Sequence, residues 1–249
     1  MKAMILAAGL GSRLKPLTDH CPKALLQAGP YTLLEFAIRK LKAAGFDELI
    51  INVHHHAPMI ISYLERNLNF GCEISISDES DQLLDTGGGI QKASWFFSDG
   101  QPFLVYNADI IGDLDLSALY ARHLKQQSLA TLVVRKRVTN RYLLFGTNSQ
   151  LCGWENLQTG ERRIARASSD PPMQLAFSGI HVINPEIFPL IQTKGRFSII
   201  DTYLALAGSN LITGYLDESQ LWADAGKPES LNQAGEIAKL ITFSDRNSV

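Results

Sequence analysis

A glycine-rich, cationic loop near the start of the chain constrains the fold and the chemistry more than any other segment. An apolar run from Ala3 to Ala8 leads into Gly9-Leu10-Gly11-Ser12-Arg13, and Pro22-Lys23 follows. A short buried strand that runs into such a loop places backbone N–H groups beside a space that an anion can occupy. Arg13 and Lys23 bring two cations to that space. The segment therefore predicts a phosphate-binding loop.

Two common phosphate-binding loops do not fit this segment. The dinucleotide fingerprint G-x-G-x-x-G needs a third glycine, whereas Leu14 follows Arg13 here. This difference argues against a nicotinamide-dependent dehydrogenase. The P-loop string G-x-x-x-x-G-K-[ST] does not occur in the chain, and Pro16 and Pro22 prevent a regular helix through the loop. An accidental glycine turn with surface cations remains the alternative.

The stretch from Leu6 to Leu25 resembles the signature of the sugar-1-phosphate nucleotidyltransferases, also called NDP-sugar pyrophosphorylases. The resemblance implies that a nucleoside triphosphate binds here and that Arg13 and Lys23 are catalytic. Arg13 is expected on the β- and γ-phosphates and Lys23 on the α-phosphate. The nucleotide-binding residues that the resemblance implies in this loop are Leu6, Ala7, Ala8, Gly9, Gly11 and Ser12.

Two apolar segments each end in an aspartate, at Asp109 and at Asp224. A Mg²⁺ ion bound to a nucleotide takes only one or two carboxylates from protein. In the family that the chain resembles, aspartates at these two motif positions hold the catalytic Mg²⁺, so Mg²⁺ is the expected cofactor. Taken singly, each aspartate is also typical of a helix N-cap or a turn, and Asp224 is close to Gly226.

Leu84-Asp85-Thr86-Gly87-Gly88-Gly89-Ile90 resembles the corresponding motif of N-acetylmuramate-1-phosphate uridylyltransferases. Glycines let a backbone pass close to a planar ring. The resemblance implies that Asp85, Thr86, Gly87 and Gly88 bind the nucleotide. Thr86 is also expected to cap the helix that follows.

The sugar-phosphate end is less regular in this sequence. Many members of the family carry a Glu-Lys-Pro segment, whereas this chain has Gly153-Trp154-Glu155-Asn156. Glu155 stands in for the glutamate, but no lysine follows it, and Lys194 and Arg196 are candidates for the missing cation. The substrate-binding residues that the resemblance implies are Asn107, Glu155, Ser178 and Gly179.

Composition narrows the function classes. The chain has 249 residues, a net charge of −2 and three cysteines without C-x-x-C spacing. The charge predicts binding neither to nucleic acid nor to an anionic membrane, and the cysteines are typical of a reducing cytoplasm. No secretion signal or membrane span is expected. We expect a cytoplasmic monomer or homodimer.

Short apolar runs alternate with amphipathic stretches through the first half, which predicts an α/β fold with a mixed, mainly parallel sheet and helices on both faces. The resemblance implies a Rossmann-like, three-layer nucleotidyltransferase fold of glycosyltransferase-A-like type. We expect one domain over 1–249, with a nucleotide-binding half at 1–110, a sugar-phosphate-binding half at 111–242 and a tail at 243–249. Predicted strands are 1–7, 48–53, 72–77, 102–106, 129–135, 142–147, 150–154, 175–183, 211–216 and 220–222. Predicted helices are 32–44, 58–67, 89–97, 116–126, 199–207 and 228–240.

The expected reaction is Mg²⁺-dependent transfer of a nucleotidyl group from a nucleoside triphosphate to a sugar-1-phosphate, with release of pyrophosphate. Uridylyl transfer of muramate type is favoured. A mannose- or heptose-1-phosphate guanylyltransferase and a cytidylyltransferase are alternatives within the class. A non-catalytic sensor of sugar nucleotides is an alternative of another class, against which the four residues Arg13, Lys23, Asp109 and Asp224 argue.

Overall fold

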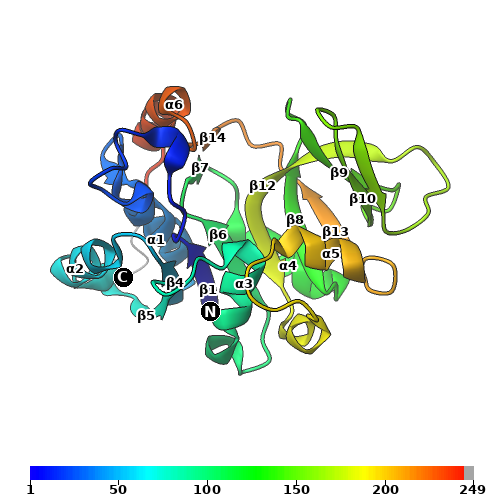
Figure 1. The fold of residues 1–249 in the computed structure, drawn as a ribbon, viewed down its shortest axis with the longest axis horizontal. Coiled ribbons are helices and arrows are strands. Elements are labelled where there is room, and N and C mark those ends of the chain that lie inside the picture. The colour runs from blue at the N-terminus through cyan, green and yellow to red at the C-terminus, as the bar shows by residue number, and fades with distance from the viewer. Residues whose placement is uncertain (244–249) are drawn as a thin grey trace. The chain divides into compact units, whose positions relative to one another are not determined.

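A computed structural model describes residues 1–243 of the chain (Figure 1). Apart from Phe243, the predicted tail at 243–249 lies outside the described residues. The helices are α1 (Leu33–Ala43), α2 (Ala57–Arg66), α3 (Asp85–Lys92), α4 (Leu116–Gln126), α5 (Ile199–Leu206) and α6 (Pro228–Leu240). The strands are β1 (Lys2–Leu6), β2 (Gln27–Ala28), β3 (Tyr31–Thr32), β4 (Glu48–Val53), β5 (Glu73–Asp78), β6 (Phe103–Asn107), β7 (Ile110–Gly112), β8 (Ala130–Arg135), β9 (Arg141–Phe145), β10 (Leu151–Asn156), β11 (Glu161–Ile164), β12 (Met173–Ile183), β13 (Ile212–Leu216) and β14 (Trp222–Asp224). The 3₁₀ turns are η1 (Ser12–Leu14), η2 (Lys23–Leu25), η3 (Leu68–Gly71), η4 (Ser94–Phe97) and η5 (Pro185–Leu190).

The chain divides into two compact units, each made of segments distant in sequence. Among the described residues, the first unit comprises Met1–Asp85, Val105–Ser117 and the segment from Ser219 onward, and the second comprises Thr86–Leu104 and Ala118–Glu218. The chain therefore returns to the first unit twice. The single domain over 1–249, with its halves at 1–110 and 111–242, stays a prediction.

The sheet of the first unit has parallel pairings around a buried strand, β1. β1 pairs with β4 in parallel, with Lys2 opposite Glu48, and β4 pairs with β5 in parallel. The strand order is β6-β1-β4-β5. Ala3, Met4 and Ile5 in β1 are completely buried, as expected for a parallel strand covered on both faces.

An apolar cluster in the first unit anchors the segments that carry the predicted site. Leu14, Ile111 and Ala225 all belong to it, together with Phe36 of α1 and Ala234 of α6. Leu14 follows Arg13 directly, and Ala225 follows Asp224. Arg13 and Asp224 are therefore each adjacent in sequence to a buried side chain, and core packing restricts where their backbones lie.

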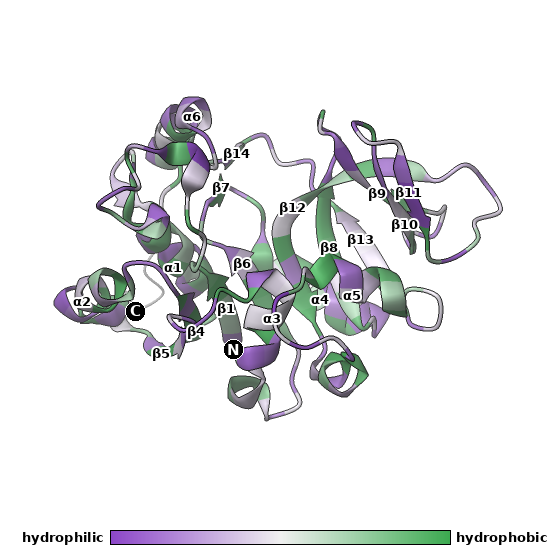
Figure 2. Ribbon diagram, viewed as in Figure 1, coloured by the Kyte–Doolittle hydropathy of each residue, from purple (hydrophilic) through white to green (hydrophobic). Residues whose placement is uncertain are grey.

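The second unit contains mainly antiparallel pairings. β12 pairs antiparallel with β8 and β9, β9 pairs antiparallel with β10, and β8 pairs in parallel with β13. β11 adds an antiparallel edge next to β10 that the sequence did not predict. Its residues Glu-Arg-Arg-Ile are exposed and are mostly hydrophilic in Figure 2, so no apolar alternation indicates a strand.

Helix α3 corrects one prediction. It begins at Asp85 and ends at Lys92, rather than spanning 89–97. Thr86 does not cap the helix, because it lies inside it and its hydroxyl oxygen accepts a hydrogen bond from the Ile199 N–H at 3.0 Å. Gly87 packs against Phe197, whose carbonyl accepts from the Gly87 N–H at 2.9 Å. A β-carbon on Gly87 would lie 2.3 Å from the Phe197 ring.

Within residues 1–243, no helix combines the length and the apolar character that crossing a bilayer requires.

Candidate functional site

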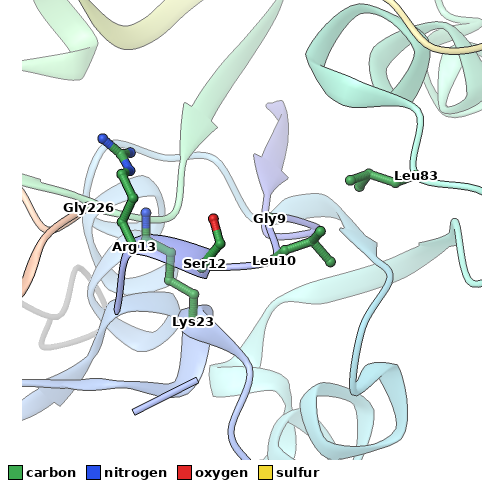
Figure 3. Close-up of a pocket in the computed structure, with 8 residues that line it drawn as sticks. Gly9, Leu10, Ser12, Arg13, Lys23, Leu83 and Gly226 are labelled. Carbon is green, nitrogen blue, oxygen red and sulfur yellow. The ribbon is translucent and has the colours of Figure 1, made fainter. Parts of the chain in front are cut away.

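The predicted phosphate loop lines a pocket of about 250 Å³ in the first unit. Figure 3 shows the side chains of Ser12, Arg13 and Lys23 extending their polar ends toward the same side of the loop. The lining residues are Gly9, Leu10, Gly11, Ser12, Arg13, Lys23, Leu83 and Gly226. Two cations and a glycine-rich backbone around one cavity suit a polyanion.

The two glycines of the loop have different physical roles. Gly11 has a φ of +63°, a conformation in the left-handed region that favours glycine. A β-carbon there would lie 2.7 Å from the Thr18 methyl carbon, and the Thr18 hydroxyl donates to the Gly11 carbonyl at 2.9 Å. Gly9 has no protein atom within 4 Å of an ideal β-carbon. Gly11 therefore closes the loop, whereas Gly9 leaves room beside the pocket.

The end of β1 is held from within the protein. The Leu6 carbonyl accepts from the Ala108 N–H at 3.1 Å. The N–H groups of Ala7 and Ala8 donate to the side-chain oxygen of buried Asn52, at 2.7 and 3.3 Å. Because both amides are engaged by Asn52, they are not donors directed at an anion. The role of these three residues in nucleotide binding stays a prediction.

The structure brings Asp109 and Asp224 to neighbouring backbone positions. β14 pairs antiparallel with β7, with Asp224 opposite Ile110, and the Ala225 N–H donates to the Asp109 carbonyl at 2.9 Å. The backbones of Asp109 and Asp224, which are far apart in sequence, therefore lie side by side in the first unit.

Each carboxylate has a specific partner. The Lys23 ammonium group forms an ion pair with Oδ2 of Asp109. Oδ1 of Asp224 accepts from the Gly226 N–H at 2.9 Å, so the turn role that the sequence left open for Asp224 is present as well. The Lys23 pair is shielded, with 14% of the lysine side chain and 22% of the aspartate side chain exposed, so it is screened less than a surface pair.

Gly226 leaves a narrow space between opposite charges. An ideal β-carbon on Gly226 would lie 2.8 Å from Oδ1 of Asp224 and 3.0 Å from Nη2 of Arg13. Only a residue without a side chain keeps both groups in these positions. The Arg13 guanidinium and the Asp224 carboxylate therefore flank one point next to the pocket.

The donor set fits Mg²⁺ bound together with a nucleotide. Across the part of the chain that the structure describes, no group of three or more His, Cys, Asp or Glu side chains could form a self-sufficient metal site. Mg²⁺ typically keeps waters and phosphate oxygens and uses one or two carboxylates. Asp109 and Asp224 provide that number, and the space at Gly226 lies directly beside one of them.

The predicted residues of the sugar end lie mainly in the second unit. Glu155 on β10 lies opposite Arg162 on β11, and its Oε2 is 3.8 Å from Nε of Arg162. The side-chain amide of Gln174 also donates to Glu155. Lys194 and Arg196, in contrast, are exposed residues of the loop before α5. Arg162, which the sequence analysis did not single out, is thus the cation beside Glu155.

Ser178 and Gly179 lie on β12, and Asn107 ends β6 in the first unit. Ser178 is 1% exposed, and its hydroxyl has no hydrogen-bond partner among the residues described. Gly179 has a φ of +78°, which explains the glycine by its backbone conformation. The Gly87 contact with Phe197 likewise explains that glycine by packing within the chain.

Three residues and one close approach were not predicted from the sequence. They are Asn52, Glu79, which is buried and accepts from the Asn52 side-chain amide at 2.8 Å, Arg162 and the close approach at Gly226. Asn52 gave a signal, because it is a polar residue inside the apolar strand Leu49-Ile50-Ile51-Asn52-Val53. Glu79 gave none, because it lies in the acidic run Asp78-Glu79-Ser80-Asp81, which is typical of a solvated loop.

Comparison with known proteins extends over nearly the whole chain. The profile of a family described as nucleotidyl transferase matches residues 2–239. An N-acetylmuramate alpha-1-phosphate uridylyltransferase from Neisseria meningitidis is 31% identical over 245 residues, covering 96% of this chain and 98% of the relative. A mannose-1-phosphate guanyltransferase from Yarrowia lipolytica is 27% identical, covering 99% of this chain and 66% of the relative.

Among solved structures, a putative glucose-1-phosphate thymidylyltransferase from Bacillus anthracis has a TM-score of 0.82 at 23% identity and covers 98% of each chain. This likeness confirms the predicted α/β fold.

Proposed function

The chain belongs to the nucleotidyl transferase family, and from that premise we propose that it transfers a uridylyl group from UTP to N-acetylmuramate 1-phosphate. Sugar-1-phosphate nucleotidyl transfer is the activity of the relatives across the whole length of the chain. The uridylyl and muramate specificity is supported by the relative from Neisseria meningitidis, which is similar in length and 31% identical.

One observation carries the proposal. Two carboxylates from separate strand ends, Asp109 and Asp224, adjoin a loop that supplies Arg13 and Lys23 around a single pocket. A module that only binds a sugar nucleotide has no need for this pair of carboxylates. The arrangement therefore favours catalysis over sensing.

The reaction needs no general base in this proposal. The phosphate of a sugar-1-phosphate has a second pKa of about 6 and is largely dianionic at neutral pH. Its oxygen attacks the α-phosphorus of the triphosphate, a new phosphoanhydride bond forms, and the bond to the leaving pyrophosphate breaks. Two anions must be held together, so positioning and charge stabilisation supply the rate.

The two cations of the loop position the triphosphate and stabilise its negative charge. Arg13 binds the β- and γ-phosphates and stabilises the charge that develops on pyrophosphate. Lys23 binds the α-phosphate, and the triphosphate competes with Asp109 for its ammonium group. Asp109 and Asp224 would hold the Mg²⁺ ion, which would neutralise phosphate charge and polarise the attacked centre.

At the sugar end, Arg162 takes the role of the lysine that the Glu-Lys-Pro segment would provide. Its place opposite Glu155 on the neighbouring strand supports this assignment. Glu155 then binds the sugar, while Arg162 meets its phosphate. Ser178 and Gly179 line the same substrate region in this proposal, and Asp85, Thr86, Gly87 and Gly88 bind the nucleotide.

A cytoplasmic location is proposed as well. All three cysteines, Cys21, Cys72 and Cys152, are free thiols, which suits a reducing compartment.

A substrate matrix tests the function. UTP, GTP, CTP and dTTP are each combined with N-acetylmuramate, glucose, mannose and heptose 1-phosphates in the presence of Mg²⁺, and pyrophosphate is measured. Fastest turnover with UTP and N-acetylmuramate 1-phosphate is expected. Fastest turnover with GTP and mannose 1-phosphate would replace this proposal by the guanylyl alternative, which the relative from Yarrowia lipolytica supports. No turnover in any combination would favour a sensor.

A further inference from the structure

A buried hydrogen-bond chain runs from the start of the phosphate loop to the segment that leads into α3. Asn52 is 3% exposed and Glu79 is completely buried. The Asn52 oxygen accepts from the N–H groups of Ala7 and Ala8. Its amide nitrogen donates to Oε1 of Glu79 at 2.8 Å, and Oε2 of Glu79 accepts from the Leu84 N–H at 3.0 Å.

These hydrogen bonds have a defined direction, because every donor among them faces an acceptor. Glu79 sits in the interior without an ion pair among the described residues, held by the neutral donors of Asn52 and Leu84. Burying a carboxyl group in this way is costly unless its hydrogen bonds are complete. An apolar pair would fill the same space at lower cost, so stability alone does not account for this pair.

The two ends of this series of hydrogen bonds lie next to segments to which the proposed function assigns nucleotide binding. Ala7 and Ala8 directly precede Gly9, the first glycine of the pocket. Leu84 directly precedes Asp85, where the proposed nucleotide-binding segment Asp85–Gly88 begins. One side chain on β4 and one after β5 thus fix two segments that the sequence separates by more than seventy residues.

We propose that Asn52 and Glu79 are positioning residues that hold the phosphate loop and the segment Leu84–Asp85 of the first unit in one fixed register for the nucleoside triphosphate. This inference rests on the proposed function only in taking the nucleotide as the ligand of both segments. Neither residue touches the reacting atoms. Their effect falls on the binding of the nucleotide and not on that of the sugar phosphate.

A pair of polarity-reversing variants tests the inference. In Asn52→Asp, a second oxygen replaces the donor that faces Glu79, and in Glu79→Gln, the amide places a donor against Asn52 or Leu84. The double variant N52D/E79Q restores the order of donors and acceptors with the net charge unchanged. In it, the new carboxylate on β4 accepts from the N–H groups of Ala7 and Ala8 and from the new side-chain amide after β5. The oxygen of that amide accepts from the Leu84 N–H.

The measured quantities are the KM for UTP, the KM for N-acetylmuramate 1-phosphate and the Tm. Each single variant should raise the KM for UTP about tenfold, the effect of one broken buried hydrogen bond. The KM for the sugar phosphate should change by less than about twofold, and the double variant should recover the KM for UTP to within about threefold of the wild type. Ser128→Ala, which removes a buried hydroxyl from the Ser128–Thr131 hydrogen bond of the second unit, is the matched control. It should lower the Tm and leave both KM values unchanged.

Three results would each overturn the inference. The first is an equal change in both KM values, and the second is a lowered Tm with an unchanged KM for UTP. The third is a double variant whose KM for UTP is raised as much as the two single effects combined. A wild-type chain without turnover would instead refute the proposed function.

Amide hydrogen exchange of the wild-type protein decides the case if the single variants do not fold. With UTP or with GTP alone, Ala7, Ala8 and Leu84 should gain protection together. Protection confined to the loop from Gly9 to Lys23 would overturn the inference, and this readout requires no turnover.

Discussion

Replacing Gly226 by alanine should separate function from stability at this site. The added methyl group would lie 2.8 Å from Oδ1 of Asp224 and 3.0 Å from Nη2 of Arg13, whereas ordinary contacts begin at 3.4 Å. Each of these charged groups must then retreat by about half an ångström. Both are the far ends of side chains, so the fold can accommodate the shift. Gly226 does not have a positive φ, and alanine is compatible with its backbone.

The expected magnitude follows from these distances. Displacing both a phosphate-binding cation and a metal-binding carboxylate should lower kcat/KM about 100-fold, or about 2.7 kcal/mol of transition-state stabilisation. The free energy of unfolding should change by less than about 1 kcal/mol, because alanine restricts the unfolded chain slightly. Steady-state pyrophosphate release and urea unfolding measure the two quantities.

Gly208→Ala is the matched control, because it makes the same backbone change in the second unit, where a β-carbon meets only the Ala165 carbonyl at 3.1 Å. It should keep native kcat/KM. A Gly226→Ala enzyme with native kinetics, or one whose activity falls only because it unfolds, would refute the reasoning.

Three further predictions follow from the same structure. Asp109→Asn should abolish pyrophosphate release while the circular dichroism spectrum is preserved, and near-native turnover would contradict the metal assignment. Gly87→Ala should lower the free energy of unfolding by about 1–3 kcal/mol, because the new carbon meets the Phe197 ring; urea unfolding measures it, and an unchanged midpoint would refute the contact. Burial lowers the pKa of His181 to about 3 and that of His123 to about 4, so below the ordinary value of 6.5 the unfolded chain binds protons that the folded chain does not. The free energy of unfolding should therefore fall as the pH drops from 6.5 to 4, which urea unfolding at several pH values measures, and a constant value over that range would contradict the burial of these two rings.

The long elements of the fold were predictable because their patterns are unambiguous. β4, α4 and α6 begin and end at the predicted residues, since periodic apolar residues carry the signal. The strands β2, β3, β7 and β11 have only two to four residues and were missed. Such strands are too short for alternation to be visible.

Helix α3 could not be predicted from local propensity. Three successive glycines disfavour a helix, yet Gly87, Gly88 and Gly89 are helical and buried. The approach of Phe197, a residue 110 positions later in the chain, explains why glycine is needed at position 87. A tertiary contact of this kind leaves no local trace in the sequence.

The candidate site was predictable where a motif carried it. The motifs pointed to Arg13, Lys23, Asp109 and Asp224, and the structure brings Asp109 beside Lys23 and beside the strand of Asp224. Arg162 was not predictable, because its relation to Glu155 depends on the register of β10 and β11. Register follows from pairing in three dimensions.

The transfer of a nucleotidyl group is tested most directly by following label from the triphosphate. UTP labelled with ³²P at either the α- or the γ-phosphate is incubated with N-acetylmuramate 1-phosphate and Mg²⁺, and the products are separated. The α-label should appear in a sugar nucleotide, and the γ-label should appear in pyrophosphate. Label from the γ-position in inorganic phosphate, or α-label that remains in UTP, would contradict the account.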